Sequence, residues 1–582
     1  MPEMRNPYEH EKDRTVYEIG RGAAWLVCLL FMALLWLPMI VEHVQKASQG
    51  KWDESPIGKL LSWRPGQGSL VDHLHKVESD LDRSGYSTEI RQRSQQWLTE
   101  NTGEGNARVF MGYDGWLFYQ PDLKALTGYG PMNPEPFSVM KDPELAKLPE
   151  TRDVVAGFAA QLKERGISLL LIPLPLKPMI YPEAITGRAE NGPLTHPDAP
   201  AFYQWLRDHD VDVLDLTADV AKVRGERKYI FRREPLKRDR EVEASEDERM
   251  KKTKDVFLQQ DTHWTPESMR HVAERVAAYV KEKYPQAIGT ESPAAPIRAV
   301  DGVTRSSMGD LVKLLDFKHP HEVFQPESVF LRVVGEGTRS TTSPIVLLGD
   351  SFTNVFNDPT IGFGVPDKDE DKQPPIRAGF AENLSLLLNR PLDVISMNGK
   401  GSTGVRVEFA KRHDDEVRSK KLVIWAIAAR DLLLSRTAAH AWNIDWAPVT
   451  FNPNKSKAST SGTENSNGPE TKAGEVVIEG KLVEKSKNQS LDTPYRNAVH
   501  TALYDVEKVE SGKLEAKQVL GVQWTYQDKK MSPFSSFAVG SRYRLTLVPW
   551  ESRPDLHQIN LQDDSTVFDA ERWFVVKAEE IK

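Results

Sequence analysis

Residues 344–353 read PIVLLGDSFT, a short apolar run that ends in Gly-Asp-Ser. Such a run, without polar alternation, is typical of a strand buried on both faces of a parallel sheet. Chemistry in these sheets collects at the carboxyl ends of the strands. Ser351 follows that end and a glycine that permits a tight turn, so it can present its hydroxyl beside backbone N–H groups. The tripeptide alone is weak evidence, because a serine after a strand can equally be a helix N-cap.

A second motif, QQDTHWTP (259–266), offers the base that a serine nucleophile needs. In an extended segment, residues two apart project to the same side, so Asp261 can orient the imidazole of His263. The other ring nitrogen is then free to face Ser351. The alternatives are an Asp turn residue with a surface histidine, or half of a metal site. No convincing second ligand cluster accompanies the pair, so we expect no metal.

The chain around these motifs alternates short apolar strands with amphipathic helices from about residue 109 to 435. The pattern predicts a strand at 167–175 and another at 421–429, and a helix from 266 to 284 that Thr265 caps. Asp114-Gly115 is expected as the turn of a hairpin. This alternation favours an α/β fold whose mostly parallel sheet is covered by helices on both faces.

Composition restricts the function. The chain has 582 residues and a net charge of -8, with no basic stripe, which argues against a nucleic-acid partner. Its single cysteine, Cys28, allows neither an intrachain disulfide nor a Cys-based metal site.

The apolar segment from 22 to 41 carries no charge and has the length of a membrane span. We expect an uncleaved anchor, because Trp36, Pro38 and Met39 stand where a cleavable signal peptide ends in small residues. Basic residues are more frequent before the segment than after it. The positive-inside rule then places the N-terminus in the cytoplasm and the rest of the chain outside.

The segments outside the α/β region have compositions of their own. Residues 42–104 are expected to form a polar, helical juxtamembrane region, and 451–475 a polar linker. Four strand-like runs within 476–582 predict a small β-sandwich or barrel. Two charged stretches, 237–255 and 366–375, interrupt the α/β region as solvated loops, with a lid role left open.

The combination of GDSF (349–352) with a separate DTH (261–263) resembles the SGNH hydrolase superfamily. In common members the Asp and His follow the serine, whereas here they precede it. That order, with an N-terminal anchor, is similar to the periplasmic alginate O-acetyltransferase (AlgJ/AlgX-like) family. DGWLFY (114–119) and IPLPLKPMIYPE (172–183) also fit the resemblance, which covers roughly residues 105–440.

The resemblance implies an SGNH-like domain at about 105–450, with Ser351 as nucleophile, His263 as general base and Asp261 as its orienter. Gly401 matches the glycine that donates to the oxyanion. Arg430 stands where these enzymes carry an oxyanion-binding asparagine, and it could also make only a structural ion pair.

Two further residues are candidates for substrate contact. Trp264 could stack on a sugar ring or belong to the core, and Lys177 could contact an anionic substrate or face water. Trp116 is expected in the core.

The implied activity is O-acetylation of an exported polysaccharide through an acetyl-serine, without metal or diffusible cofactor. A membrane-bound O-acyltransferase would donate the acetyl group, and the chain would sit in the inner membrane with its catalytic domain in the periplasm. An acetyl esterase of the same fold and a non-catalytic secretion scaffold are the alternatives.

Overall fold

The computed structural model describes residues 20–581 with gaps. The gaps are 53–54, 65–69, 72, 75–76, 79–84, 134–144, 189–191, 225–254, 290–295, 359–360, 362, 364–376, 452–474, 487, 489–496, 515, 528–529, 554–555, 557–558 and 563–570. Almost all of both charged stretches and of the linker therefore lies outside the described residues. The chain forms two compact units, residues 1–97 and 98–582.

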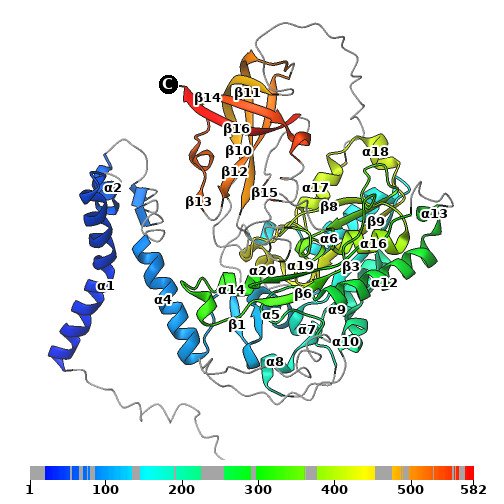
Figure 1. The fold of residues 1–582 in the computed structure, drawn as a ribbon, viewed down its shortest axis with the longest axis horizontal. Coiled ribbons are helices and arrows are strands. Elements are labelled where there is room, and N and C mark those ends of the chain that lie inside the picture. Colours follow the sequence, from blue (N-terminus) through cyan, green and yellow to red (C-terminus); the bar gives the residue numbers. More distant parts are fainter. Residues whose placement is uncertain are drawn as a thin grey trace, which may run out of the picture. The chain divides into compact units, whose positions relative to one another are not determined.

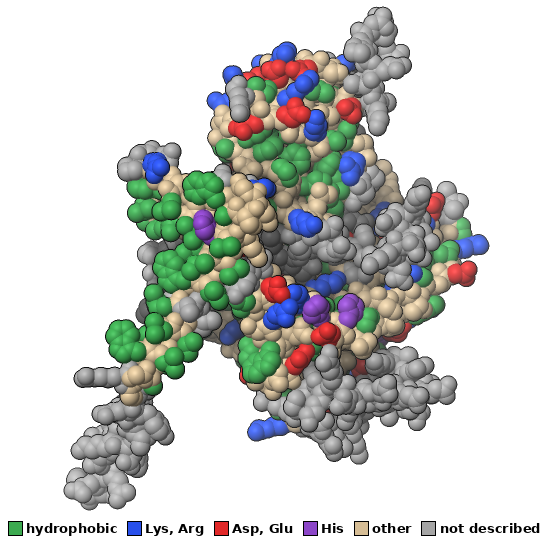
Figure 2. All heavy atoms as spheres, turned by 60° about the vertical axis from the view of Figure 1, so that its left-hand side comes forward, with side chains coloured by type: hydrophobic (Ala, Val, Ile, Leu, Met, Phe, Trp, Pro, Cys, Tyr) green, Lys and Arg blue, Asp and Glu red, His purple; other side chains and the backbone are tan. Residues whose placement is uncertain are grey.

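The first unit is helical, with α1 (Arg21–Ser48) and α2 (Pro56–Ser62), and α4 (Gly85–Thr102) crosses its boundary. Apolar side chains on α1 are exposed, among them Trp25 at 69% and Leu29 at 63%. Figure 2 shows hydrophobic side chains gathered along these N-terminal helices.

The predicted membrane anchor at 22–41 falls within α1. The side chains at 33–35 and 38 lie outside the described set. Within the part of the chain that the structure describes, no helix is both long and apolar enough to cross a membrane. The membrane anchor at 22–41 stays a prediction.

The second unit contains the predicted α/β domain (Figure 1). Its five-stranded sheet has the order β4-β3-β9-β7-β8, and every neighbouring pair is parallel. The central strands β3, β9 and β7 are almost wholly buried, as their continuous apolar sequence predicts. The strands are β4 (Asp212–Val213), β3 (Ser168–Leu174), β9 (Leu422–Ala428), β7 (Ile345–Gly349) and β8 (Asp393–Ser396).

Amphipathic helices cover this sheet. α12 (Pro266–Lys283) packs beside α16 (Phe380–Leu388) and buries Met269, Val272 and Val276. α6 (Thr151–Lys163) and α17 (Gly404–Ala410) share an aromatic cluster in which Phe158 and Phe409 pack on Phe451. The sheet and these helices share the largest hydrophobic cluster of the described residues, which fixes the ends of the central strands.

The predicted hairpin forms from β1 (Val109–Met111) and β2 (Leu117–Tyr119), which pair antiparallel. Asp114 and Gly115 make its turn with φ of 53° and 75°, a left-handed backbone that glycine adopts without steric cost. β5 (Val303–Ser307) and β6 (Glu327–Leu331) form a second antiparallel pair.

The C-terminal region is a closed barrel rather than a sandwich (Figure 1, orange and red). β10 pairs with β11 and β14, β11 with β12, β12 with β16, and β16 with β14, which closes a ring. Only the β12–β16 pair of this ring is parallel, so the order is that of an OB-fold, a Greek-key barrel of five strands. The ring strands are β10 (Val476–Lys485), β11 (Ala498–Ser511), β12 (Gln518–Gln527), β14 (Arg542–Pro549) and β16 (Glu571–Ile581).

The barrel touches the α/β domain near the loop that follows β8. Arg572 on β16 makes a two-pronged ion pair with Glu408 on α17, at 2.7 and 2.9 Å. Lys400 donates to Gln562 Oε1 at 2.7 Å. Gln562 lies on β15 (Asn560–Gln562), a short strand paired with β11. The barrel is therefore held against residues 400–408 by polar contacts.

Candidate active site

Ser351 lies where the sequence predicts it, directly after β7, as the first residue of α15 (Ser351–Asn354). Asp350 fixes this turn. One of its carboxylate oxygens accepts from the Phe352 N–H at 2.9 Å, and the other accepts from the Ala428 N–H at 2.8 Å. The serine is thus tied to the ends of β7 and β9. Burial raises the pKa of Asp350, and the two N–H donors oppose that rise.

His263 lies in a bend just before α12. Trp264 forms an isolated antiparallel bridge with Phe257, and the Leu258 N–H donates to the His263 carbonyl at 3.1 Å. Thr265 caps α12 by accepting from the Ser268 N–H at 3.3 Å. The cap and the bridge hold the histidine backbone on both sides.

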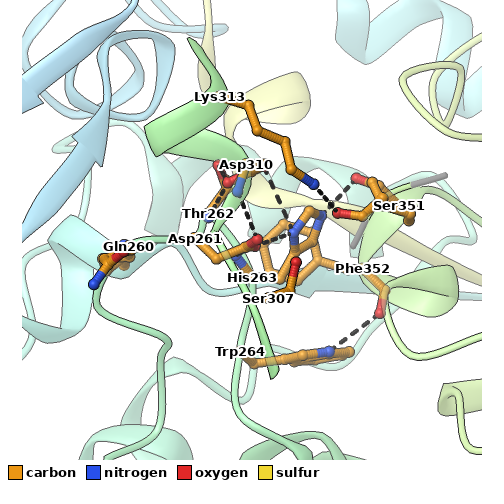
Figure 3. Close-up of polar contacts among 12 residues, drawn as sticks. Gln260, Asp261, Thr262, His263, Trp264, Ser307, Asp310, Lys313, Ser351 and Phe352 are labelled. Atoms are coloured by element: carbon orange, nitrogen blue, oxygen red, sulfur yellow. Dashed lines mark hydrogen bonds and ion pairs between the residues drawn. The ribbon is translucent and has the colours of Figure 1, made fainter. Parts of the chain in front are cut away.

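The three side chains form a continuous hydrogen-bonded chain (Figure 3). Asp261 Oδ1 lies 2.6 Å from His263 Nδ1, and His263 Nε2 lies 2.8 Å from Ser351 Oγ. The Asp261 oxygen also accepts from the His263 backbone N–H at 3.0 Å. All three residues are buried, and Ser351 is 5% exposed. This geometry lets the imidazole take the serine proton while the carboxylate fixes its tautomer.

The contact between Asp261 and His263 favours the charged form of each side chain. Burial opposes charge on both partners, but His263 and the Asp310 N–H together outweigh it and hold the pKa of Asp261 at about 2. The same contact raises the pKa of His263 against the opposing effect of burial. The carboxylate is therefore ionised at neutral pH and stabilises the imidazolium that proton transfer from Ser351 creates.

Two backbone N–H groups are available for an oxyanion. Within the described residues, neither the Ser351 N–H nor the Gly401 N–H has a hydrogen-bond acceptor. A Cβ on Gly401 would come within 2.8 Å of Asp350 Cβ, so the glycine packs directly against the residue before the serine. Unpaired donors beside the nucleophile are what an oxyanion hole requires.

The family described as "SGNH hydrolase-like domain, acetyltransferase AlgX" matches residues 109–235 and 241–429, more than half of the chain. The chain belongs to this AlgX family. The match spans the parallel sheet and all three residues of the hydrogen-bonded chain.

Curated relatives of this AlgX-family chain include the probable alginate O-acetylase AlgJ of Pseudomonas aeruginosa. It is 23% identical over 354 residues, which are 59% of this chain and 75% of the relative. The AlgJ of Pseudomonas putida is 23% identical over 361 residues, 61% of this chain and 77% of that protein.

Solved structures of similar proteins include the O-acetyltransferase domain of Pseudomonas putida AlgJ. It is 19% identical, with a TM-score of 0.37, over 56% of this chain and 91% of that one. Pseudomonas aeruginosa AlgX is 13% identical, with a TM-score of 0.37, over 76% of this chain and 93% of its own.

Arg430 of this AlgX-family member makes an ion pair, the second of the two alternatives that its sequence position allows. It lies at the start of α19 (Ala429–Leu433), after β9, and its Nη1 donates to Asp122 Oδ1 at 2.9 Å. The guanidinium also lies 5.3 Å from the ring centre of Tyr119. A second oxygen of Asp122 is buried without a partner among the described residues. The oxyanion role of Arg430 stays a prediction.

Of the two alternatives for Trp264, a sugar contact or a place in the core, the structure shows the core. The side chain is fully buried, its Nε1 donates to the Phe352 carbonyl at 3.1 Å, and its ring stacks on Phe380. Trp264 follows the bend at His263 and pairs with Phe257, and its side chain lies in the core.

Lys177 fits neither of its two alternatives, because it does not face water and is not open to a substrate. Its side chain is 1% exposed, and Nζ donates to the carbonyls of Leu117 at 2.7 Å and Gln259 at 3.1 Å. Burial lowers its pKa to about 8. The ammonium joins β2 to the segment that carries the histidine. Trp116 is in the core as predicted, stacked on Tyr181.

One further acidic residue of the site, Asp310, is not predicted from the sequence. Its Oδ2 lies 3.8 Å from His263 Nδ1. With Asp261 and His263 it forms a group that could in principle hold a metal ion. The donor atoms do not fit one, because the carboxylate oxygens of Asp261 already accept from N–H groups of His263 and Asp310. Of the Asp310 oxygens, Oδ1 accepts from the Thr262 N–H and hydroxyl.

Proposed function

We propose that this chain is a polysaccharide O-acetyltransferase that works through an acetyl-serine intermediate. AlgX-family membership makes it a relative of acetyltransferases, and its curated relatives are named as alginate O-acetylases. The observation that carries the proposal is the unbroken chain of hydrogen bonds from Asp261 through His263 to Ser351. This chain supplies both a nucleophile and the base that activates it.

The first half-reaction loads the acetyl group. His263 Nε2 takes the Ser351 proton while Oγ attacks the carbonyl carbon of the acetyl donor. The N–H groups of Ser351 and Gly401 would donate to the negative oxygen of the tetrahedral intermediate. When the intermediate collapses, the bond to the donor breaks, and His263 returns its proton to the leaving group. Acetyl-Ser351 and the free donor remain.

The second half-reaction transfers the acetyl group from Ser351 to the sugar. A sugar hydroxyl gives its proton to His263 Nε2 and attacks the acetyl carbon. Collapse breaks the bond to Oγ, and His263 gives the proton back to Ser351. The products are an acetylated sugar and the original enzyme. Water in place of the sugar would give an esterase, so transfer requires that the acceptor excludes water.

The cellular setting belongs to the proposal. The uncharged run at 22–41 and the exposed apolar side chains of α1 support attachment to the inner membrane. The catalytic domain, at about 105–450, would then face the periplasm, where a membrane-bound O-acyltransferase supplies acetyl groups. Resistance of the full chain to extraction by alkaline carbonate would support the attachment, and release into the supernatant would contradict it.

The test follows acetyl transfer directly. The purified full chain is incubated with an activated acetyl ester and a panel of oligosaccharides, while ester cleavage and sugar mass are measured together. We expect acetylated sugar from the wild type and a loss of at least about 10³-fold in Ser351→Ala. Ser419→Ala, an exposed serine whose hydroxyl bonds its own helix, is the matched control.

Three outcomes decide the matter. Acetylated sugar that depends on Ser351 supports the transferase. Ester cleavage that depends on Ser351 but yields no acetylated sugar, over a panel that includes alginate oligomers, favours the esterase. Folded wild-type protein that cleaves no ester contradicts the proposed chemistry and favours a non-catalytic scaffold.

A further inference from the structure

Asp310 is a buried carboxylate that the proposed reaction does not use. It is 4% exposed and is the first residue of α14 (Asp310–Leu314). It lies 47 residues after His263 in sequence, yet its Oδ2 is 3.8 Å from His263 Nδ1. Figure 3 shows it beside Asp261 and Thr262, at the end of the imidazole that faces away from Ser351.

Asp310 and the segment 261–263 hold each other by reciprocal hydrogen bonds. The Asp310 N–H donates to Asp261 Oδ2 at 2.8 Å. In return, Asp310 Oδ1 accepts from the Thr262 N–H at 2.7 Å and from the Thr262 hydroxyl at 3.1 Å. Both oxygens of Asp261 are thereby fixed, one by His263 and the other by Asp310. The carboxylate that orients the imidazole cannot rotate without breaking one of these bonds.

The residue before Asp310 gives independent evidence of this close approach. A Cβ on Gly309 would lie 2.0 Å from the Gln260 carbonyl oxygen and 2.7 Å from the Asp261 nitrogen. No side chain fits between the start of α14 and the segment that carries the base. The φ of Gly309 is -59°, an ordinary value, so the glycine serves the close approach rather than an unusual backbone.

We propose that Asp310 is a second acidic positioning residue of this site, which locks Asp261 in place and adds negative charge beside His263. The inference rests on the proposed acyl transfer. Its chemical consequence is that the imidazolium formed when Ser351 loses its proton faces two carboxylates instead of one. Stabilising that cation makes His263 a stronger base toward Ser351 and toward the sugar hydroxyl.

The electrostatics agree with the geometry. Burial and the neighbouring Asp261 charge raise the pKa of Asp310 to about 6, so its charge is present at pH 7 and above. Asp310 in turn raises the pKa of His263, as do Asp261 and Asp350. Other charged or titratable groups of this region are Lys177, Glu327, Asp122, Arg430 and Tyr119.

The test is the variant Asp310→Asn in the full chain. The amide oxygen can still accept from Thr262, and the backbone N–H to Asp261 stays, so chiefly the charge is removed. Without that charge the pKa of His263 falls, and the acidic limb of kcat/KM for an activated acetyl ester moves to lower pH by about one unit. The rate above pH 7.5 falls about three- to tenfold, because the base is weaker.

Two controls separate charge from structure. Asp301→Asn makes the same charge change at an exposed site and should leave both the limb and the rate unchanged. Thermal unfolding of Asp310→Asn shows whether the fold is intact. If that variant does not fold, Thr262→Val serves instead. It removes one donor to the Asp310 carboxylate and should move the limb in the same direction by less.

The outcomes also separate this inference from the proposed function. Cleavage that survives Ser351→Ala overturns the proposed function. If ester cleavage requires Ser351 but Asp310→Asn keeps the wild-type rate and the wild-type acidic limb of the pH profile, the role of Asp310 alone is overturned. A lower rate with an unmoved limb means that Asp310 only supports the structure, and this also overturns the charge argument. A limb shifted to lower pH in a folded variant supports it.

Discussion

At the scale of single residues, Arg430 has two possible roles, an ion pair with Asp122 and stabilisation of the oxyanion. The two roles predict different effects of substitution on stability and on activity. Its partner Asp122 is buried, and Arg430 itself is largely so. Arg430→Met leaves the Asp122 charge unpaired in the core, so we expect unfolding to become easier by roughly 3–5 kcal/mol. Arg430 also lies 3.4 Å from Asp431, so Asp122→Leu added to Arg430→Met removes one of two stranded carboxylates and should restore part of that stability. Chemical denaturation of the three variants measures both effects.

Activity of the same double variant then tests the oxyanion role. If Arg430 only pairs with Asp122, the folded double variant should cleave an acetyl ester within about threefold of the wild-type rate. A loss of about 10²-fold in kcat with partly restored stability would instead assign the arginine to the oxyanion, since this is the effect of removing one such donor. Fluorescence and kinetics on one preparation give the comparison.

At the scale of elements, α14 and the segment 260–263 depend on the missing side chain of Gly309. Gly309→Ala places a methyl group 2.0 Å from the Gln260 carbonyl, so one of the two elements must shift. A displacement of about 1 Å at the base costs on the order of 10²-fold in rate. We expect kcat to fall by about that factor while the remaining core stays folded.

Gly157 provides the matched control for this element-scale prediction. It lies on the exposed side of α6, and a Cβ there would meet nothing within 4 Å. Gly157→Ala should leave kcat unchanged and raise the free energy of unfolding by about 0.5–1 kcal/mol, because alanine favours a helix. Equal effects of the two substitutions on activity would contradict the close approach at Gly309.

At the scale of the whole molecule, the barrel contacts the α/β domain close to the loop that carries Gly401. The Arg572–Glu408 pair is bidentate and its side chains are 18% and 21% exposed, so breaking it also costs stability. Arg572→Glu opposes two like charges, and we expect kcat to fall about three- to tenfold together with a lower thermal midpoint.

The exchanged pair, Arg572→Glu with Glu408→Arg, is the internal control for that prediction. It restores opposite charges at the same place and should recover most of the lost rate. Steady-state kinetics on the single and double variants measures the coupling between the two sites. A rate that is unchanged in both single variants would mean that the barrel does not influence the loop.

Local sequence determined the elements and the residue types of the site. The apolar runs at 167–175, 344–349 and 421–429 became central strands, because continuous hydrophobicity suits a sheet covered on both faces. Asp261 and His263 are two apart, so an extended segment would bring their side chains together. In the structure they meet in a bend, where the His263 N–H also donates to Asp261 Oδ1. The structure brings them to Ser351, and their catalytic roles stay a prediction.

Tertiary structure alone decided what depends on contacts between distant segments. The sequence left Trp264 between a sugar contact and the core, and Lys177 between an anionic substrate and water. Both side chains are buried, since periodicity does not say which side of a segment another element will cover. Asp310 went unnoticed because an Asp beside a Gly is common, and only packing brings it to His263 across 47 residues. The barrel closes through pairs such as β10–β14 and β11–β12. A strand's sequence shows which of its side chains are polar or apolar, but it does not show which strand will pair with it.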